Sequence, residues 1–264
     1  MRFSFFFIFL FGINFINAQD FEVAPVVLNY NANPGEIQQS TVTIRNHANI
    51  KQAFTFIVGD FEVDENGQKK RMPAGTSSRS CADWITINPS LLELNPNEER
   101  QINVIITVPK DGFASKWAMI YAQAATEQKE NPVDKELGTG IRLTPRIVIL
   151  VTQSPKVNNN YKAGIKNLKE ITTIKDSLRT FEMLVENNGD KIIEAKVNLA
   201  IGNMLTGKEE KFPGTMRKIY PGEKRKYLLT IPDSIAPGEY ALLALLNYGH
   251  GTNLEGDQII ISIE

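Results

Sequence analysis

The sequence predicts an all-β protein built from two tandem immunoglobulin-like antiparallel β-sandwiches. Apolar residues alternate with period two in many short segments, and turn-forming residues separate these segments at intervals of roughly eight to twelve residues. No stretch longer than about ten residues has a convincing helical pattern. The 264-residue chain has a single cysteine, Cys81, so no internal disulfide can form. Each domain must therefore be large enough to bury a core of its own.

The first series of predicted strands is clearest in QINVIITVP, residues 101–109. Here Ile102, Val104 and Ile106 fall on one face of an extended segment, which is typical of a strand with one buried side. The turn-rich stretches NANPGE, DENGQ, NPNEE and PKDG lie between such strands, and we expect one domain over residues 19–152. The other segments of this series are 21–30, 39–46, 53–63, 82–94, 115–125 and 140–153.

A polar stretch, TQSPKVNNNYK, interrupts the pattern, and we interpret residues 153–162 as a linker. Beyond it the period-two pattern returns, which predicts a second domain over residues 163–264. Its segments are 168–176, 178–188, 191–201, 216–220, 226–232, 238–249 and 256–264.

One short pattern occurs three times in the chain. LNPNEERQINVIITVP at 94–109 has counterparts in IYPGEKRKYLLTIP at 219–232 and NPGEIQQSTVTIRN at 33–46. In each, proline followed by glycine or asparagine indicates a turn, a glutamate follows, and an alternating strand comes next. We therefore interpret the recurring glutamate as part of a turn and not as a catalytic acid.

The N-terminus has the pattern of a secretory signal peptide. It reads MRFSFFFIFLFGINFINAQ, with a basic Arg2, an apolar run at 5–12 and a small residue, Ala18, before Gln19. The apolar run is too short to span a bilayer, and no stop-transfer segment follows. We therefore expect residues 1–18 to be removed and the mature protein to be exported, without a transmembrane segment.

Residues suited to catalysis or metal binding are few and scattered. His47 and His250 lie in turn-like segments without a second ligand at metal-binding spacing, and Cys81 has no protease signature around it. DENG at 64–67 is a hairpin-turn signal that lacks the later carboxylates of a calcium loop. The sequence therefore predicts no catalytic residue, no metal and no cofactor. An enzyme would need Cys81, a histidine and a carboxylate to meet in one cleft.

The order of parts carries a resemblance to a known family. In the first domain FEVAPVVLNYNANPGE leads into STVTIRN, WITINPSLLELNPNEERQINVIITVP, SKWAMIYAQA and a last long strand, IRLTPRIVILV. The second domain contains VENNGDKIIEAKV and YPGEKRKYLLTIPDSIAPGEYALLALLNYG. Over most of residues 21–264 these stretches resemble the PapD-like periplasmic chaperone superfamily. The layout is also similar to that of the two-domain bacterial WxL-interacting proteins.

The resemblance implies a protein of the periplasm or cell surface of a bacterium that binds its partner by strand addition. In this mode an edge strand with alternating apolar side chains pairs with a partner subunit. The segment that fits is IRLTPRIVILV. The partner-binding side chains implied there are Ile141, Leu143, Ile147, Ile149 and Val151.

Basic residues form two further candidate sites. Pilus chaperones of this superfamily hold the partner's terminal carboxylate with one basic residue on the first strand of domain one and one on its last strand. The resemblance therefore implies a charge anchor at Arg142 and Arg146, although the first strand here, FEVAPVVLNY, has no Lys or Arg. A second cluster of basic residues is interpreted either as a binding site for an acidic protein or polymer, or as a solvated edge that discourages aggregation. It consists of Arg217, Lys218, Lys224, Arg225 and Lys226.

These features predict an exported, non-enzymatic, chaperone-like protein that assists the assembly or display of envelope or surface proteins. Its predicted partners are such protein subunits, and the formal net charge of −1 gives no field that favours nucleic acid. The alternative is a structural or adhesion module of a cell-envelope complex that binds a protein scaffold or a cell-wall glycan. Exposed aromatic side chains would favour the glycan.

Overall fold

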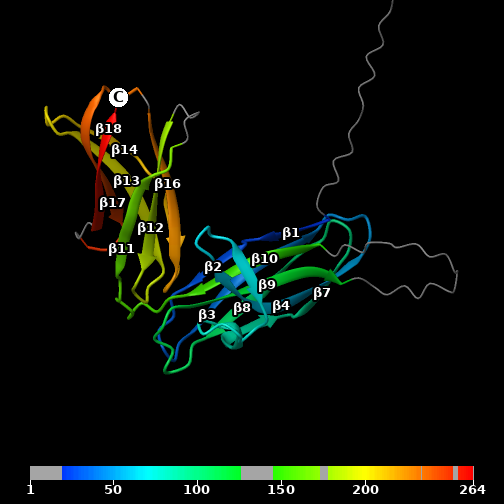
Figure 1. Cartoon of the computed structure of the whole chain (residues 1–264). Helices are drawn as coiled ribbons and strands as arrows, with labels where there is room; N and C mark the ends of the chain where they lie inside the picture. The colour runs from blue at the N-terminus through cyan, green and yellow to red at the C-terminus, as the bar shows by residue number, and fades with distance from the viewer. Residues whose placement is uncertain (1–19, 126–144, 173–177, 233, 252–254, 264) are drawn as a thin grey trace, which may run out of the picture.

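The computed structural model (Figure 1) describes residues 20–125, 145–172, 178–232, 234–251 and 255–263. This part of the chain consists of β-strands and one short 3₁₀ helix, η1 (Ala82–Trp84), and it contains no helix long and apolar enough to cross a membrane. The predicted signal peptide lies outside the described residues, and so do residues 141–144 of the strand implied in partner binding.

Two β-sheets form the first domain. The strands of one sheet are β1 (Phe21–Ala24), β3 (Ile37–Asn46), β8 (Glu99–Thr107) and β6 (Ile85–Asn88), in that spatial order. Those of the other are β2 (Val27–Tyr30), β10 (Arg146–Gln153), β9 (Lys116–Ala125), β4 (Gln52–Val63) and β5 (Lys69–Met72), again in spatial order, with β7 (Leu91–Leu94) also paired to β4. The pairing of β10 with β2 is parallel, whereas its pairing with β9 is antiparallel.

The second domain repeats this two-sheet plan. Its smaller sheet has the order β11 (Ala163–Glu170), β12 (Leu178–Asn187) and β16 (Lys224–Pro232). The larger sheet has the order β14 (Glu209–Phe212), β13 (Ile193–Asn203), β17 (Gly238–Asn247) and β18 (Glu255–Ile263), with β15 (Met216–Ile219) also paired to β13. The predicted fold class, two tandem antiparallel sandwiches, is confirmed.

Each domain has its own apolar core, and the period-two pattern explains which side chains enter it. In β8 the side chains of Ile102, Val104 and Ile106 are fully buried in the first core. Phe181 and Tyr227 are fully buried in the second core, and the Tyr227 hydroxyl donates a hydrogen bond to the carbonyl of Ala195 at 2.7 Å. Such a bond lets a tyrosine occupy a core without leaving its hydroxyl unpaired.

The recurring turn has the same geometry each time. Gly35, Asn97 and Gly222 occupy the left-handed region, with φ of 84°, 60° and 78°, as the third position of a type II turn requires. The next residue is the glutamate, whose carboxylate accepts a hydrogen bond from the backbone N–H three residues earlier, at 2.8 Å in all three turns. The interpretation of these glutamates as turn residues is confirmed.

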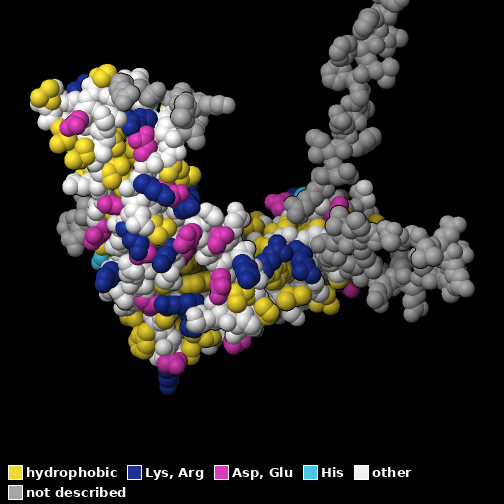
Figure 2. Space-filling view, in the orientation of Figure 1, with side chains coloured by type: hydrophobic (Ala, Val, Ile, Leu, Met, Phe, Trp, Pro, Cys, Tyr) yellow, Lys and Arg dark blue, Asp and Glu magenta, His cyan; other side chains and the backbone are white. Residues whose placement is uncertain are grey.

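The two domains meet at an aromatic cluster. Tyr220 from the second domain packs against Phe61 and Trp117 of the first, with ring centroids 5.6 Å and 4.9 Å apart. Met119 completes the buried cluster, and Ile192 packs against it from the second domain. In Figure 2 hydrophobic side chains continue from this junction onto the face of the first domain. The relative position of the domains therefore depends on apolar burial as well as on the connecting segment.

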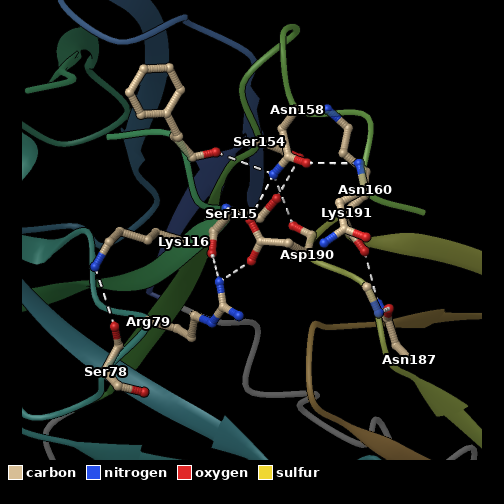
Figure 3. A network of polar contacts seen from close by, with 12 residues as sticks. Ser78, Arg79, Ser115, Lys116, Ser154, Asn158, Asn160, Asn187, Asp190 and Lys191 are labelled. Atoms are coloured by element: carbon tan, nitrogen blue, oxygen red, sulfur yellow. Dashed lines mark hydrogen bonds and ion pairs between the residues drawn. The ribbon is translucent and has the colours of Figure 1, made fainter. Parts of the chain in front are cut away.

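Figure 3 shows a polar network that is joined to this cluster, since the backbone N–H of Trp117 donates to the carbonyl of Arg79 at 2.9 Å. Asp190 of the second domain accepts hydrogen bonds from the Arg79 guanidinium and from the backbone N–H of Ser115, both in the first domain. Asn158 of the connecting segment donates to the same carboxylate at 2.8 Å. Lys191 Nζ donates to the carbonyl of Pro155 at 2.6 Å. The segment between β10 and β11 is thus tied to both domains.

We expect Tyr220→Ala to lower the free energy of unfolding by roughly 3 kcal/mol, because it removes a buried ring from the junction. Urea denaturation monitored by tryptophan fluorescence would measure the loss, since Trp117 lies in the cluster. Leu205→Ala is the matched control, because Leu205 is 94% exposed. Equal effects of the two substitutions would contradict the role assigned to the junction.

The stabilising contribution of the turn glutamate Glu98 should depend on pH. A hydrogen bond from the backbone N–H of Asn95, and then Arg100, favour its charged form and lower the pKa of Glu98. Its stabilising contribution is complete above the unfolded carboxyl pKa of about 4.3 and disappears as the pH falls through the lower folded value. Glu98→Gln should therefore destabilise the protein at pH 7, and much less near pH 3.

Urea unfolding of wild type and variant at both pH values would measure this difference. Glu239→Gln, at an exposed carboxylate, provides the control. A Glu98→Gln penalty of the same size at both pH values would show that the charge of this carboxylate contributes nothing.

Candidate partner-binding edge and inter-domain cleft

The first strand of the fold is divided between the two sheets of domain one. β1 pairs with β3 up to Ala24, the Ala24–Pro25 peptide bond is cis, and from Val27 onward β2 pairs with β10 in the other sheet. This second pairing covers only residues 150–153 of β10. Residues 146–149 pair with β9 on one side, and no strand of the described chain pairs with them on the other. β10 therefore has one half with an open edge.

The hydrogen bonds of β10 show which backbone groups face this open edge. Leu150 N–H donates to the carbonyl of Val26 at 2.9 Å, and Ser154 N–H donates to that of Tyr30 at 3.0 Å, so even-numbered residues face β2. Backbone groups of a strand alternate in direction along the chain. The N–H and C=O groups of Val148 and Arg146 therefore point to the open side.

A groove of about 700 Å³ lies beside the open edge, on the side where the chain changes sheets. Its apolar lining comes from β1, from Val26 between β1 and β2, and from β10. His47 Nε2 lies 3.1 Å from a Glu22 carboxylate oxygen within this lining. The lining residues are Phe21, Glu22, Val23, Val26, His47, Arg146 and Ile147. A groove of this size can receive apolar side chains from an added strand.

The structure shows where three of the five implied partner-binding side chains lie. Ile149 and Val151 are fully buried in the first core, and Ile147 packs partly against it. The reason is that β10 forms part of a sandwich wall, so its odd-numbered side chains point inward. Ile149 and Val151 are thus core residues. The backbone groups at the edge of β10 are then the part of this strand that a partner could contact. Ile141 and Leu143 lie outside the described residues.

The structure describes one of the two arginines of the implied charge anchor. Arg142 lies outside the described residues. Arg146 is exposed, lines the groove, and has its guanidinium carbon 6.0 Å from the centre of the Tyr121 ring. Arg146 is therefore placed beside the open edge, where a partner strand would pass.

The structure divides the basic cluster of the second domain into two groups. Lys224 and Lys226 lie on the outer face of the smaller sheet, each 3.3 Å from a carboxylate oxygen of Glu186 or Glu182. Arg217, Lys218 and Arg225 instead line a cavity of about 440 Å³ between the two domains. This cavity also receives Lys69 from β5, which sequence reasoning missed because β5 and β15 are far apart in the chain.

Arg225 is the buried member of this cavity lining. Its guanidinium pairs with the Glu223 carboxylate, which also caps the turn at Tyr220. Burial raises the pKa of Glu223, while the adjacent Arg225 favours the charged form. Arg225 Nη1 also lies against Gly67 of the first domain, where a φ of 89° favours glycine. Arg225 therefore joins the domains as well as lining the cavity.

The residues considered for catalysis do not form a reactive group. Cys81 is fully buried in the first core, and burial raises the pKa of its thiol to about 12, so it stays protonated. The ring of His250 stacks on Tyr161 with centroids 4.1 Å apart, and Tyr161 packs against the core of the second domain, whereas Cys81 lies in that of the first. The described residues contain no group of three or more His, Cys, Asp or Glu side chains that could hold a metal.

Aromatic side chains are mostly used in packing. Trp117 is buried at the domain junction, and Trp84 packs partly buried against the first core. Five of the seven tyrosines are buried, and the other two, Tyr121 and Tyr161, are partly buried. Among the described aromatic side chains Phe113 is exposed, at 59%, whereas the tryptophan and tyrosine rings form no exposed platform for a glycan.

No protein-family model matches the chain, and no curated protein sequence matches it. Among solved structures, it is similar to a chain of the chaperone–tip adhesin complex of CFA/I fimbriae biogenesis, with 13% identity, a TM-score of 0.49, and coverage of 92% of this chain and 98% of that one. The class 5 fimbriae chaperone CfaA is 12% identical to the chain, with a TM-score of 0.48 and coverage of 91% of this chain and 98% of that one. The Escherichia coli chaperone DraB is 14% identical, with a TM-score of 0.43 and coverage of 90% of this chain and 98% of that one.

The strand order defines the class of protein: two tandem immunoglobulin-like sandwiches, in which the first strand of domain one divides between both sheets.

The open edge predicts a pattern of hydrogen exchange. The amides of Ile147 and Ile149 face β9 and belong to its ladder, whereas the amide of Val148 faces the open side. We expect Val148 to exchange roughly 100-fold faster than its two neighbours, because exchange from a paired strand requires local opening. Amide exchange followed by NMR would measure the three rates. Equal protection of the three amides would mean that another part of the chain covers the edge.

Proposed function

We propose that this chain is an exported, non-enzymatic, chaperone-like protein that captures envelope or surface protein subunits by β-strand addition. The capturing element is the open edge of β10 at Arg146–Ile149. The observation that carries the proposal is the combination of an edge with which no described strand pairs and a largely apolar groove beside it. An added strand would pair with the edge and place alternate side chains in the groove.

Simple energetics indicate which part of the site would supply affinity. Each backbone hydrogen bond contributes a net of only about 0.5–1.5 kcal/mol, and the open edge offers few of them. A micromolar complex requires about 8 kcal/mol. Burial of apolar side chains, at about 25 cal/mol per Å², would supply the rest. The edge therefore sets the register of the partner, and the groove provides most of its affinity.

The edge is also held in position before a partner arrives. β10 pairs with β9 along its whole length, and Ile149 and Val151 fasten it to the core. A preorganised edge reduces the entropy lost on binding. The loss would be larger if the binding strand itself had to become ordered.

The proposal predicts that Val148→Pro abolishes partner capture. Proline removes one N–H from the open edge and leaves the ladder with β9 intact, because the Val148 N–H does not face β9. The measurement is cross-linking in the native envelope, followed by mass spectrometry of the captured proteins. Val148→Ala is the matched control, since it shortens the side chain but keeps the N–H.

Both variants should unfold at the temperature of the wild type within a few degrees, which thermal denaturation would verify. Capture of one family of surface proteins by wild type and Val148→Ala, with loss in Val148→Pro, supports strand addition. Unchanged capture by Val148→Pro rejects it. Recovery of one fixed large complex by all three proteins would instead support the alternative, a structural or adhesion module. Charged substitution at Ile149 is unsuitable, because a charge in the core would unfold the domain.

A further inference from the structure

The cavity between the domains collects positive charge from both of them. Lys69 comes from β5 of the first domain, and Arg217, Lys218 and Arg225 come from β15 and β16 of the second. Apolar and neutral side chains complete the lining. They are Val27, Leu150, Thr152 and Tyr220. No acidic residue is among the lining residues that the structure describes.

Three of these four cations have no carboxylate partner within the described part of the chain. Arg225 pairs with Glu223. Lys218 Nζ donates to a neutral group, the Asn29 side-chain carbonyl, at 3.4 Å, and Arg217 lies over the Tyr227 ring with its guanidinium carbon 5.3 Å from the centroid. Lys69 has no ion pair there within 4 Å, although its charge favours the ionised form of Glu223.

The neighbouring lysines show that this lack of partners is local. Lys224 and Lys226 flank Arg225 on the same strand, and both have glutamates on the adjacent strand. On the outer face of this sheet four lysines share two glutamates, so each lysine has a carboxylate within 4 Å. Lys69, Arg217 and Lys218 on the cavity side have none in the described part of the chain. Like charges gathered in a partly desolvated cleft repel each other more strongly than in water, and an anion would relieve this repulsion.

The position of the cavity indicates a polypeptide anion. Val26 lines the groove and Val27 lines the cavity, so the two hollows lie on either side of one peptide bond. Both valines are more than two-fifths exposed, at 44% and 43%, so the passage between the hollows is apolar and accessible. A strand added at β10 can therefore extend toward the cavity.

We propose that the cavity between the domains binds an acidic segment of the partner, with two or more Asp or Glu side chains. The charge balance sets this number, because a single carboxylate would leave two of the three unpartnered cations without a counter-charge. The volume of about 440 Å³ lies within the range of roughly 300–1,000 Å³ found for ligand sites. This inference rests on the proposed function only in taking the ligand to be a polypeptide.

The test uses the full mature chain and labelled peptides in fluorescence anisotropy. The probe is an amidated Gly-Asp-Glu-Asp-Glu-Gly peptide. Two comparison peptides replace Asp and Glu by Asn and Gln, one amidated and one with a free terminal carboxylate. The cleft variant combines Lys69→Gln, Arg217→Gln and Lys218→Gln. The charge-matched control combines Lys110→Gln, Lys156→Gln and Lys211→Gln, at exposed lysines outside the cavity.

We expect the cleft variant to bind the acidic peptide at least roughly tenfold more weakly than wild type, and the control variant to bind with nearly unchanged affinity. Wild-type affinity should fall as salt is raised, since screening weakens the attraction. The cleft variant should also unfold at a temperature equal to or above that of wild type, because repulsion between the three cations is removed.

Two results would overturn the inference. Unchanged affinity in the cleft variant would place acidic binding elsewhere, and equal binding of the neutral peptide with a free carboxylate would mean that a single terminal charge suffices. Neither result affects strand addition, which is tested at Val148 with native partners. Conversely, normal capture by Val148→Pro together with weak peptide binding by the cleft variant would reject strand addition and retain the acidic site.

Discussion

The packing of Tyr220 against Phe61 and Trp117 is the contact on which the geometry between the domains depends. It buries one aromatic ring of the second domain against the outer face of a sheet of the first. The Asp190 network beside it pairs the polar groups that this contact removes from water. Because the two domains are held in this way, Lys69 faces the same cavity as Arg217.

A second constraint acts within the first domain, where one chain segment supplies strands to both sheets. β1 places Phe21 and Val23 in the core, and β2 pairs with only half of β10. A longer β2 would pair the whole strand and protect it from unwanted association. It would also remove the open edge and fill the adjoining groove. Among the described strands, the arrangement leaves a small part of this sheet without a partner in a domain that is otherwise well packed.

The sequence predicted much of the fold but less of the candidate site. Period-two alternation located the strands, and the proline-containing turns were identified with their glutamates. The same alternation could not show whether Ile149 and Val151 face a partner or the core, because both cases have the same apolar pattern. Only the packing of this sheet against the other sheet of the domain decides this. The basic cluster was found, but its division into paired lysines and cavity-lining residues depends on the neighbouring strands.

By itself, the sequence determined the properties that arise from short-range chemistry: the strands, the turns and the fold class of two sandwiches. These depend on backbone preferences and on which face of a segment is apolar, and neighbouring residues fix both. Only the tertiary structure decided which backbone edge is left open and which positive charges meet without partners. Those properties depend on pairing and packing between residues far apart in the chain, such as Val26 with Leu150 and Lys69 with Lys218.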